Sequence, residues 1–325
     1  MMLLFVVLLL LIVGFIYQSN ASRRDLEKFP APGKLVKTSQ GDIHLHCQGQ
    51  GDVTVILESG QGDSSLDWAV VQSAVAQFAR VCTYDRPGLG WSSPATNILT
   101  AQQIADNLHQ TLKGADIAGP YILVGHSIGG VYARAFAQQH SKDIAGLVFV
   151  DSAHENQRYR LPSDMIKEGT ILKGFASVFR ALAPVGIPRA LKLADRMQGD
   201  NFPDDVRPAA MARMYQSHFF KALFNEVKAS ELSTAQTEPP ADLGNTPLIV
   251  LSRGGINPDL PEAQFKQLKQ IWNELQQNLV NLSTNSQHII AEKSGHYIHH
   301  DQPELVVNAI RQIVNASQTR RGNIR

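Results

Sequence analysis

The sequence predicts an α/β protein with a mostly parallel central sheet flanked by helices. Short apolar runs, typical of strands buried on both faces, alternate along the chain with longer segments of helical periodicity. A strand, a helix and a second strand in this order imply a parallel pair. At 325 residues, the chain is long enough for one large domain of this class that contains an insertion.

The first segment differs from the rest, because residues 1–17 are almost wholly apolar. Their number lies between the core of a signal peptide, about 7–15 residues, and a membrane-spanning helix of about 20 residues. We therefore predict a signal peptide or a membrane anchor over residues 1–21, with membrane association through residues 1–17.

Two signals disagree about where this segment places the body of the protein. Ser19-Asn20-Ala21 resembles a cleavage site of small residues and favours export with removal of the segment. The positive charges of Arg23 and Arg24 follow the apolar residues, which favours a body on the cytoplasmic side. An exported or membrane-anchored protein is the prediction that we retain, and a cytoplasmic-facing body is the alternative.

A polar linker over residues 22–33 leads into the first part of the core, residues 34–155, where strands and helices are expected to alternate. The expected strands are Lys34–Thr38 and Ile43–Cys47, paired as a hairpin, and then residues 53–57, 81–84, 121–124 and 146–150. The expected helices span residues 66–79, capped by Ser64 or Ser65, 100–113, capped by Thr100, and 131–139.

The alternation stops after Asp151, and residues 156–244 carry helical stripes of apolar side chains separated by prolines. The expected elements then resume with a strand at 248–251, a helix at 261–279, a strand at 288–291 and a helix at 303–314. We therefore expect residues 34–155 and 245–316 to form one core. Residues 156–244 are expected to be a helical lid that roofs the site, and residues 317–325 a solvated basic tail.

The hexapeptide Gly125-His126-Ser127-Ile128-Gly129-Gly130 lies between an expected strand and an expected helix. In this context, the pattern G-x-S-x-G predicts a turn so tight that the serine is held clear of the sheet. Gly125 and Gly129 are the positions at which any side chain would collide with the neighbouring strand or helix. Ser127 is therefore the candidate nucleophile, and a glycine-rich turn with an idle serine is the alternative.

With this motif the chain resembles the α/β-hydrolase superfamily over roughly residues 34–316, and most of all its lidded esterases, lipases and aminopeptidases. Three further stretches carry the resemblance: LESGQG at residues 57–62, YDRPGLGWS at 84–92 and GHYIHHDQP at 295–303. The resemblance implies a nucleophile, an acid and a histidine in this chain order. Epoxide hydrolases and haloalkane dehalogenases resemble the chain too, but they use a carboxylate where this sequence has Ser127.

The histidine that fits this order is His296. Among the eleven histidines, it alone follows the last expected strand, with a glycine before it and Asp-x-Pro after it. A general base must reach the serine, and a loop after a strand allows that. His299 and His300 are expected at the rim or at the start of a helix. His126 is expected to pack under the turn, as it usually does in such folds.

The acid that orients the histidine has two candidates. In most of these enzymes it follows the strand that here is 248–251, but this sequence has Asn257 where the aspartate belongs. Asn257 cannot supply the negative charge that stabilises an imidazolium. Some members of the superfamily place the acid after the preceding strand, where Asp151 lies. Asp151 is therefore the preferred acid, and Asp259 is the alternative. A carboxylate that only caps the turn after the strand is the other interpretation of Asp151.

Two backbone N–H groups are expected to form an oxyanion hole. Ile128 supplies one, and Gln61 is aligned with the position from which family members supply the other. Asp85 and Arg86 are expected to brace the neighbouring loop through hydrogen bonds. None of these steps needs a metal ion or an organic cofactor.

The composition of the chain excludes some classes of binding partner. Charged residues make up 18% of the chain and the formal net charge is +1, which argues against nucleic acid or an acidic polymer. Cys47 and Cys82 are too few for a zinc site or a disulfide scaffold. One bridge forms between them if their strands are neighbours in an oxidising compartment; otherwise they are two small buried hydrophobic residues.

The sequence therefore predicts a serine hydrolase that cleaves a carboxylic ester with an apolar group, through an acyl-enzyme on Ser127. The apolar stripes of the lid suggest the apolar group. Three alternatives stay open. The same triad could cleave an amide, a thioester or a C–C bond, the fold could be a non-catalytic receptor for small molecules, or the chain could be a mainly structural membrane-anchored module.

Overall fold

The computed structural model describes residues 1–198, 201–240, 242–255 and 262–322. Within these residues, the strands form one eight-stranded sheet in the order β1-β2-β4-β3-β5-β6-β7-β8. β1 (Lys34–Thr38) and β2 (Gly41–Gln48) form the predicted hairpin, and β2 is also antiparallel to β4. The other neighbouring strands run parallel. The mostly parallel sheet flanked by helices is confirmed.

The remaining elements of the core lie close to their predicted ranges. The strands are β3 (Thr54–Glu58), β4 (Arg80–Tyr84), β5 (Tyr121–His126), β6 (Ile144–Val150), β7 (Leu248–Arg253) and β8 (Ser286–Ala291). The helices are α2 (Ala69–Val75), α3 (Ala101–Gly114), α4 (Ile128–Gln139), α11 (Glu262–Val280), α12 (Ile298–Asp301) and α13 (Pro303–Gly322), with 3₁₀ turns η1 (Ser65–Trp68) and η2 (Ser141–Asp143). The predicted caps hold, because Ser64 and Thr100 precede η1 and α3 in capping boxes.

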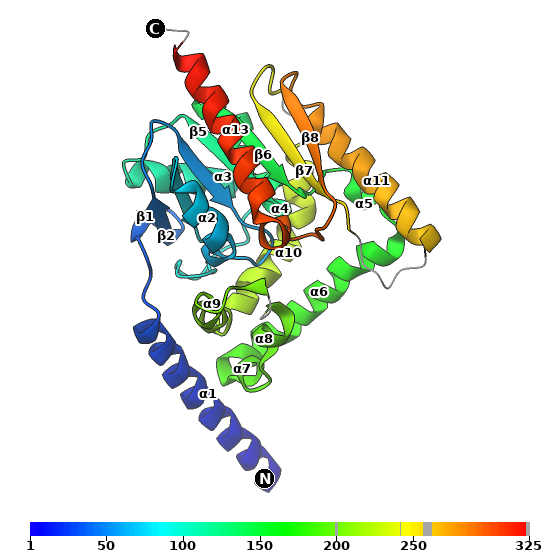
Figure 1. The fold of residues 1–325 in the computed structure, drawn as a ribbon. Coiled ribbons are helices and arrows are strands. Elements are labelled where there is room, and N and C mark those ends of the chain that lie inside the picture. Colours follow the sequence, from blue (N-terminus) through cyan, green and yellow to red (C-terminus); the bar gives the residue numbers. More distant parts are fainter. Residues whose placement is uncertain (199–200, 241, 256–261, 323–325) are drawn as a thin grey trace.

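Helices cover both faces of the sheet (Figure 1), and a separate apolar cluster lies between the sheet and the helices on each face. One face packs against α2 and α13, and the other packs against α3, α4 and the end of α11. All five residues of β3 are buried, as the continuous apolar run predicts for a strand that is covered on both sides. Because parallel strands end at one edge of the sheet, the loops that follow β3, β5 and β6 come together there.

Helices fill the described residues between β6 and β7. They are α5 (Gln157–Arg160), α6 (Ser163–Leu182), η3 (Ala183–Val185), α7 (Ile187–Ala190), α8 (Leu193–Gln198), α9 (Arg207–Met214) and α10 (Phe219–Ala235). We call this part, residues 157–235, the helical insertion. It has an apolar cluster of its own, in which Phe175, Phe179 and Phe219 pack around Phe220.

The two ends of the chain differ from the prediction. The first helix, α1 (Met2–Lys28), continues through residues 22–28, where we expected a linker. Those residues include no proline or glycine, and the first proline is Pro30, so the helix has no reason to stop earlier. For the same reason α13 continues to Gly322, which makes the first part of the expected tail helical.

Cys47 and Cys82 lie directly opposite each other on the antiparallel strands β2 and β4, and they form a disulfide. The bridge closes a loop with a sequence separation of 35 residues. We expect the paired change Cys47→Ala and Cys82→Ala to lower the free energy of unfolding by about 2–4 kcal/mol. Urea unfolding with and without dithiothreitol measures this. The reductant should destabilise the natural chain and leave the double variant unchanged, and an unaffected natural chain would contradict the prediction.

Candidate active site

Ser127 occupies a strained turn between β5 and α4. Its backbone has φ 53° and ψ −124°, a conformation that residues other than glycine rarely adopt. A Cβ on Gly125 would lie 2.6 Å from Gly130 Cα, and one on Gly129 would lie 2.5 Å from the carbonyl oxygen of Glu58. The two glycines are therefore needed where the sequence placed them, because strand, turn and helix approach each other too closely for a side chain.

Strand β6 and the residues after it hold this turn in place. The N–H of Ser127 donates to the carbonyl oxygen of Val150 at 3.1 Å, and its own carbonyl oxygen accepts from the N–H of Ala153 at 2.9 Å. The side chain of Ser127 is partly exposed, whereas the flanking His126 and Ile128 are buried. The strain is thus stabilised by backbone hydrogen bonds, and the turn presents the serine outward.

The structure brings Asp151 and His296 together, although they are far apart in the sequence. Asp151 follows β6 and His296 lies in the loop between β8 and α12. Oδ2 of Asp151 lies 2.6 Å from Nδ1 of His296. The aspartate is fully buried and the imidazole is one-third exposed, so the carboxylate lies behind the ring and leaves its other nitrogen for a partner.

Asp151 has two further partners that sequence reasoning missed. Its Oδ1 accepts from the indole N–H of Trp272 at 2.7 Å and from the backbone N–H of Arg253 at 3.1 Å. Burial by itself would raise the pKa of this carboxyl. The charge of Arg253, 3.5 Å away, and the hydrogen bond to His296 outweigh burial and hold the pKa below its usual value. Asp151 is therefore ionised at neutral pH, and its backbone has a positive φ of 43°.

His126 connects the loop of His296 to the turn of Ser127. Nε2 of His126 donates to the backbone carbonyl of His296 at 3.0 Å, and the two ring centroids are 4.6 Å apart. Because His126 directly precedes Ser127, this contact places His296 beside the turn. Burial lowers the pKa of His126. The ring is neutral and packed under the turn, which agrees with its expected place.

The other expected positions gave mixed outcomes. Asn257 and Asp259 lie outside the described residues. His299 and His300 both belong to α12, as a helix start predicts, but His299 is buried and stacks on Trp68 rather than lying at a rim. In η1, which also contains Trp68, burial and the charge of Asp63 raise the pKa of Asp67 well above its usual value.

The two expected oxyanion donors are the backbone N–H groups of Gln61 and Ile128. Gln61 lies in the loop after β3, and Ile128 is the first residue of α4. Among the described residues, neither backbone N–H has a hydrogen-bond acceptor. The side-chain Nε2 of Gln61 is also buried without a partner. These donors are therefore available for a negatively charged oxygen.

Arg86 fixes the loop that carries Gln61. Its guanidinium donates to the carbonyl oxygens of Ser59 at 2.8 Å and Gly60 at 2.6 Å. It also binds the carboxylates of Glu58 at 2.8 Å and Glu226 at 2.6 Å. Burial opposes the charge of this guanidinium, but the two carboxylates raise the pKa of Arg86 well above its usual range. Arg86 thus braces the loop through hydrogen bonds, as expected. One of its ion-pair partners, Glu226, comes from the helical insertion.

Glu226, on α10, completes this network and was missed by the sequence analysis. Its Oε2 accepts from the backbone N–H of Gly62 at 2.8 Å. The loop after β3 is therefore held between Arg86 of the core and Glu226 of the insertion. Only the tertiary structure brings these two residues together. Asp85 contacts the end of the same loop, as expected: its Oδ1 accepts from the N–H of Ser65 at 2.7 Å, and its Oδ2 lies 2.7 Å from Nδ1 of His44.

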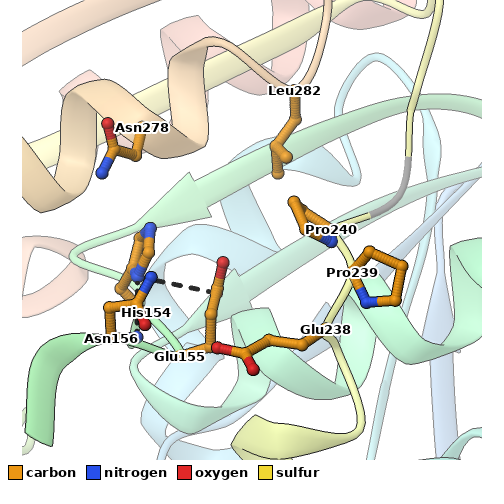
Figure 2. A pocket seen from close by; sticks show the side chains of 8 residues that line it. All are labelled: His154, Glu155, Asn156, Glu238, Pro239, Pro240, Asn278 and Leu282. Carbon is orange, nitrogen blue, oxygen red and sulfur yellow. Dashed lines mark hydrogen bonds and ion pairs between the residues drawn. The ribbon is translucent and has the colours of Figure 1, made fainter.

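Two cavities adjoin these elements. A cavity of about 370 Å³ lies between the residues after β6 and the end of α11, and Figure 2 shows its lining, which includes His154, Glu155 and Glu238. It contains none of the expected site residues. A second cavity, of about 10 Å³, lies between Gly62 of the loop after β3 and the helical insertion, where it is lined by Phe202, Met214 and Phe219 among others.

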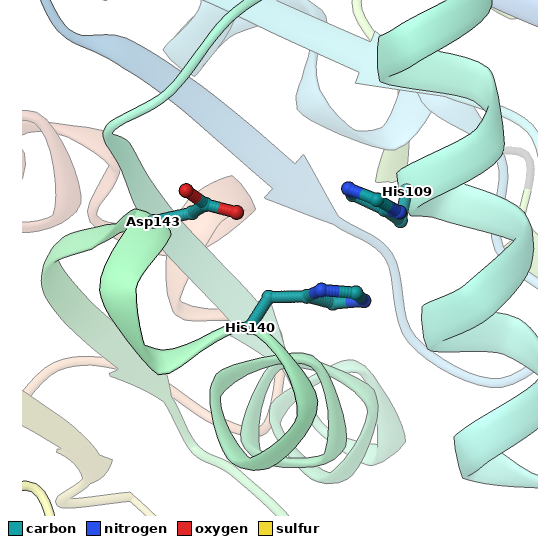
Figure 3. A group of neighbouring side chains, drawn as sticks. All are labelled: His109, His140 and Asp143. Atoms are coloured by element: carbon teal, nitrogen blue, oxygen red, sulfur yellow. The ribbon is translucent and has the colours of Figure 1, made fainter.

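One group of possible metal ligands occurs among the described residues. His109, His140 and Asp143 have ligand atoms within 4.8 Å of one another, as Figure 3 shows. The two imidazoles are stacked, with centroids 4.0 Å apart and planes 21° apart. Lone pairs lie in the ring planes, so those of stacked rings run side by side and do not converge on one ion. His140 and Asp143 lie beyond the C-terminal end of α4, whose first residue follows Ser127.

Comparisons with known proteins agree with this fold. A sequence model described as the alpha/beta hydrolase family matches residues 55–309. The uncharacterized protein C23C11.06c of Schizosaccharomyces pombe is 27% identical over 326 residues, which cover 87% of this chain and 56% of that protein. This chain thus spans little more than half the length of that relative.

Solved structures of two kinds of hydrolase have the same fold. An esterase from Thermogutta terrifontis is 20% identical, with a TM-score of 0.64 and coverage of 87% of this chain and 97% of that one. The Cif epoxide hydrolase of Acinetobacter nosocomialis is 15% identical, with a TM-score of 0.71 and coverage of 92% and 96%. The matched family model, the strained turn at Ser127 and these shared folds lead to one conclusion: the chain belongs to the alpha/beta hydrolase family.

Proposed function

We propose that this member of the family is a serine hydrolase that cleaves a carboxylic ester with an apolar group. The observation that carries the proposal is the ionised Asp151, hydrogen-bonded to His296, in a loop that packs beside the strained turn of Ser127. The acid and the base are in direct contact, and acyl transfer further requires that the base reach the hydroxyl of the nucleophile.

In the proposed mechanism, the hydroxyl oxygen of Ser127 attacks the carbonyl carbon while His296 takes the hydroxyl proton. The N–H groups of Gln61 and Ile128 stabilise the oxyanion. When the tetrahedral intermediate collapses, the C–O bond to the alcohol breaks and His296 gives its proton to the leaving oxygen. Water then attacks the acyl-enzyme, with His296 as base, and the acid and free Ser127 are released. Asp151 keeps the imidazole in the correct tautomer throughout.

Two observations support an ester with an apolar group. The helical insertion, which we propose acts as a lid, carries an apolar cluster of its own around Phe220. The Thermogutta terrifontis protein with the same fold is named an esterase. The structural similarity to an epoxide hydrolase would suggest epoxide hydrolysis as another reaction. However, this chain has Ser127 at the turn where epoxide hydrolases have a carboxylate.

Labelling with a fluorophosphonate tests this proposal directly. We expect the probe to attach to Ser127 of the full chain and to abolish hydrolysis of short and long p-nitrophenyl esters. Ser127→Ala should remove the labelling and lower kcat by roughly 10⁶-fold. Ser152, which lies close by with its hydroxyl 3.4 Å from the carbonyl oxygen of Ser127, offers a matched control, because Ser152→Ala should keep the labelling.

The alternatives give different results in the same assay. Faster turnover of an anilide or a thioester than of any ester would move the proposal to amide or thioester hydrolysis on the same residues. An unlabelled Ser127 in a folded protein contradicts the serine hydrolase. If a small molecule then still raises Tm, the chain is a receptor, and if none does, a structural role is favoured.

We also propose that the body of the protein faces an oxidising compartment. The disulfide between Cys47 and Cys82 supports this location, because such bonds persist outside reducing compartments. The apolar segment of α1 is long and apolar enough to cross a membrane, although a signal sequence has the same properties. Protease added outside the membrane should digest a body that faces the oxidising side and leave a cytoplasmic-facing body intact.

A further inference from the structure

The two halves of helix α1 have opposite surroundings. Between Met2 and Tyr17 the apolar side chains are exposed, with Leu10 at 65% exposure, whereas Gln18 is only 3% exposed. A helix that is apolar on all sides is stable in a protein core or in a bilayer. At about 1.5 Å per residue the exposed half is about 24 Å long, close to the ~30 Å hydrocarbon core of a membrane. In Figure 1 this half projects away from the body, where lipid can surround it.

Polar contacts fasten the second half of α1 to the helical insertion. The side-chain amide of Gln18 donates to the carbonyl oxygen of Tyr215 at 2.7 Å, and the guanidinium of Arg189 donates to Oε1 of Gln18 at 3.1 Å. Arg189 also pairs with Asp25 at 2.7 Å. Cleavage after Ala21 would remove Gln18 from the centre of this interface. These contacts therefore favour a retained anchor over a removed signal peptide.

Close backbone packing sets the height of the insertion along α1. A Cβ on Gly14 would lie 2.6 Å from the carbonyl oxygen of Val185, and a Cβ on Gly186 would lie 2.8 Å from the ring of Tyr17. Gly14 belongs to the apolar half. If the apolar half of α1 enters a bilayer, the segment from η3 to α7, which packs against Gly14 and Tyr17, lies at the membrane boundary.

The residues that follow this segment have the side chains of a membrane-contacting surface. Leu191, Lys192, Arg196 and Met197 are all exposed, and we call these four the anchor-side surface. Within residues 191–197, Lys192 and Arg196 are two exposed cations beside a single acid, Asp195. Apolar side chains enter the boundary between headgroups and acyl chains, while cations bind anionic headgroups.

We propose that α1 is a retained membrane anchor and that the anchor-side surface rests on the anionic surface of the same bilayer. The partner is lipid, recognised by negative charge and an apolar layer beneath it. The proposal concerns how the insertion is placed, so it does not depend on the hydrolytic activity, and an inactive protein would leave it standing.

Fluorescence quenching by labelled lipids tests the contact. The two native cysteines form a disulfide, so one new cysteine can be labelled selectively. The full chain is placed in nanodiscs of phosphatidylcholine and phosphatidylglycerol with an NBD label at Leu191→Cys or Met197→Cys. The control label is at Lys142→Cys, an exposed position that precedes β6, whereas the insertion follows that strand.

Lipids with a shallow doxyl group are expected to quench the labels at 191 and 197 at least about twofold more than the label at 142, and less so without phosphatidylglycerol. Arg189→Met, which removes the contacts to Gln18 and Asp25, should reduce the quenching at 197. Intact mass should show that residues 1–21 are present. Equal quenching at all three labels, or a mature chain without residues 1–21, overturns the proposal.

Discussion

Replacing Asp151 with asparagine is expected to lower kcat by about 10⁴-fold while the protein stays folded. The carboxylate accepts from Nδ1 of His296 and thereby selects the tautomer whose other nitrogen can take the proton of Ser127. An amide in the same place can offer an N–H to His296, which selects the wrong tautomer. Steady-state kinetics on the preferred ester, with circular dichroism as the check of folding, measures this effect.

Asp259→Asn is the matched control for this change. We expect its kcat to stay within about threefold of the natural chain, because His296 already has its carboxylate partner. A loss confined to Asp259→Asn would transfer the role of the acid to Asp259, and no loss in either variant would contradict a carboxylate-assisted mechanism altogether.

The same carboxylate has a signature in stability. The pKa of Asp151 is lower in the folded protein than its usual value, so its ionised form stabilises the fold above about pH 4. This contribution is lost as the pH falls through the folded pKa. Asp151→Asn should therefore lose less stability on acidification than the natural chain does.

Arg86→Met is expected to lower the free energy of unfolding by about 3–5 kcal/mol. The change leaves the buried carboxylates of Glu58 and Glu226 without their cation, and it frees the carbonyl oxygens of Ser59 and Gly60. Because those residues precede Gln61, kcat should fall in the protein that remains folded. Urea unfolding and kinetics at low temperature measure the two effects.

Two variants separate charge from position in this network. Arg158→Met removes an exposed ion pair with Glu231 and should cost less than about 1 kcal/mol. Glu226→Gln keeps the shape of the side chain and removes its charge, so it should lower kcat by weakening the hold on Gly62, with a smaller loss of stability than Arg86→Met. If Arg86→Met costs no more than Arg158→Met, the network does not hold the loop.

Local patterns in the sequence determined the fold class and most element boundaries. Buried parallel strands need apolar side chains on both faces, and the caps at Ser64 and Thr100 depend on neighbours only a few residues away. The turn at Ser127 could be predicted for the same reason, because Gly125 and Gly129 are required by contacts within one strand-turn-helix unit. The ends of α1 and α13 were missed because polar residues fit a linker and a helix surface equally well.

Tertiary structure alone decided which distant groups meet. Asp151 was inferred from the place of a strand end, but its partners Trp272 and Arg253 come from α11 and β7, and no local spacing marks them. Glu226 reaches the loop after β3 only because the helical insertion folds back over the core. Side-chain pairing across such sequence separations depends on how whole elements pack, and that information is spread over the entire chain.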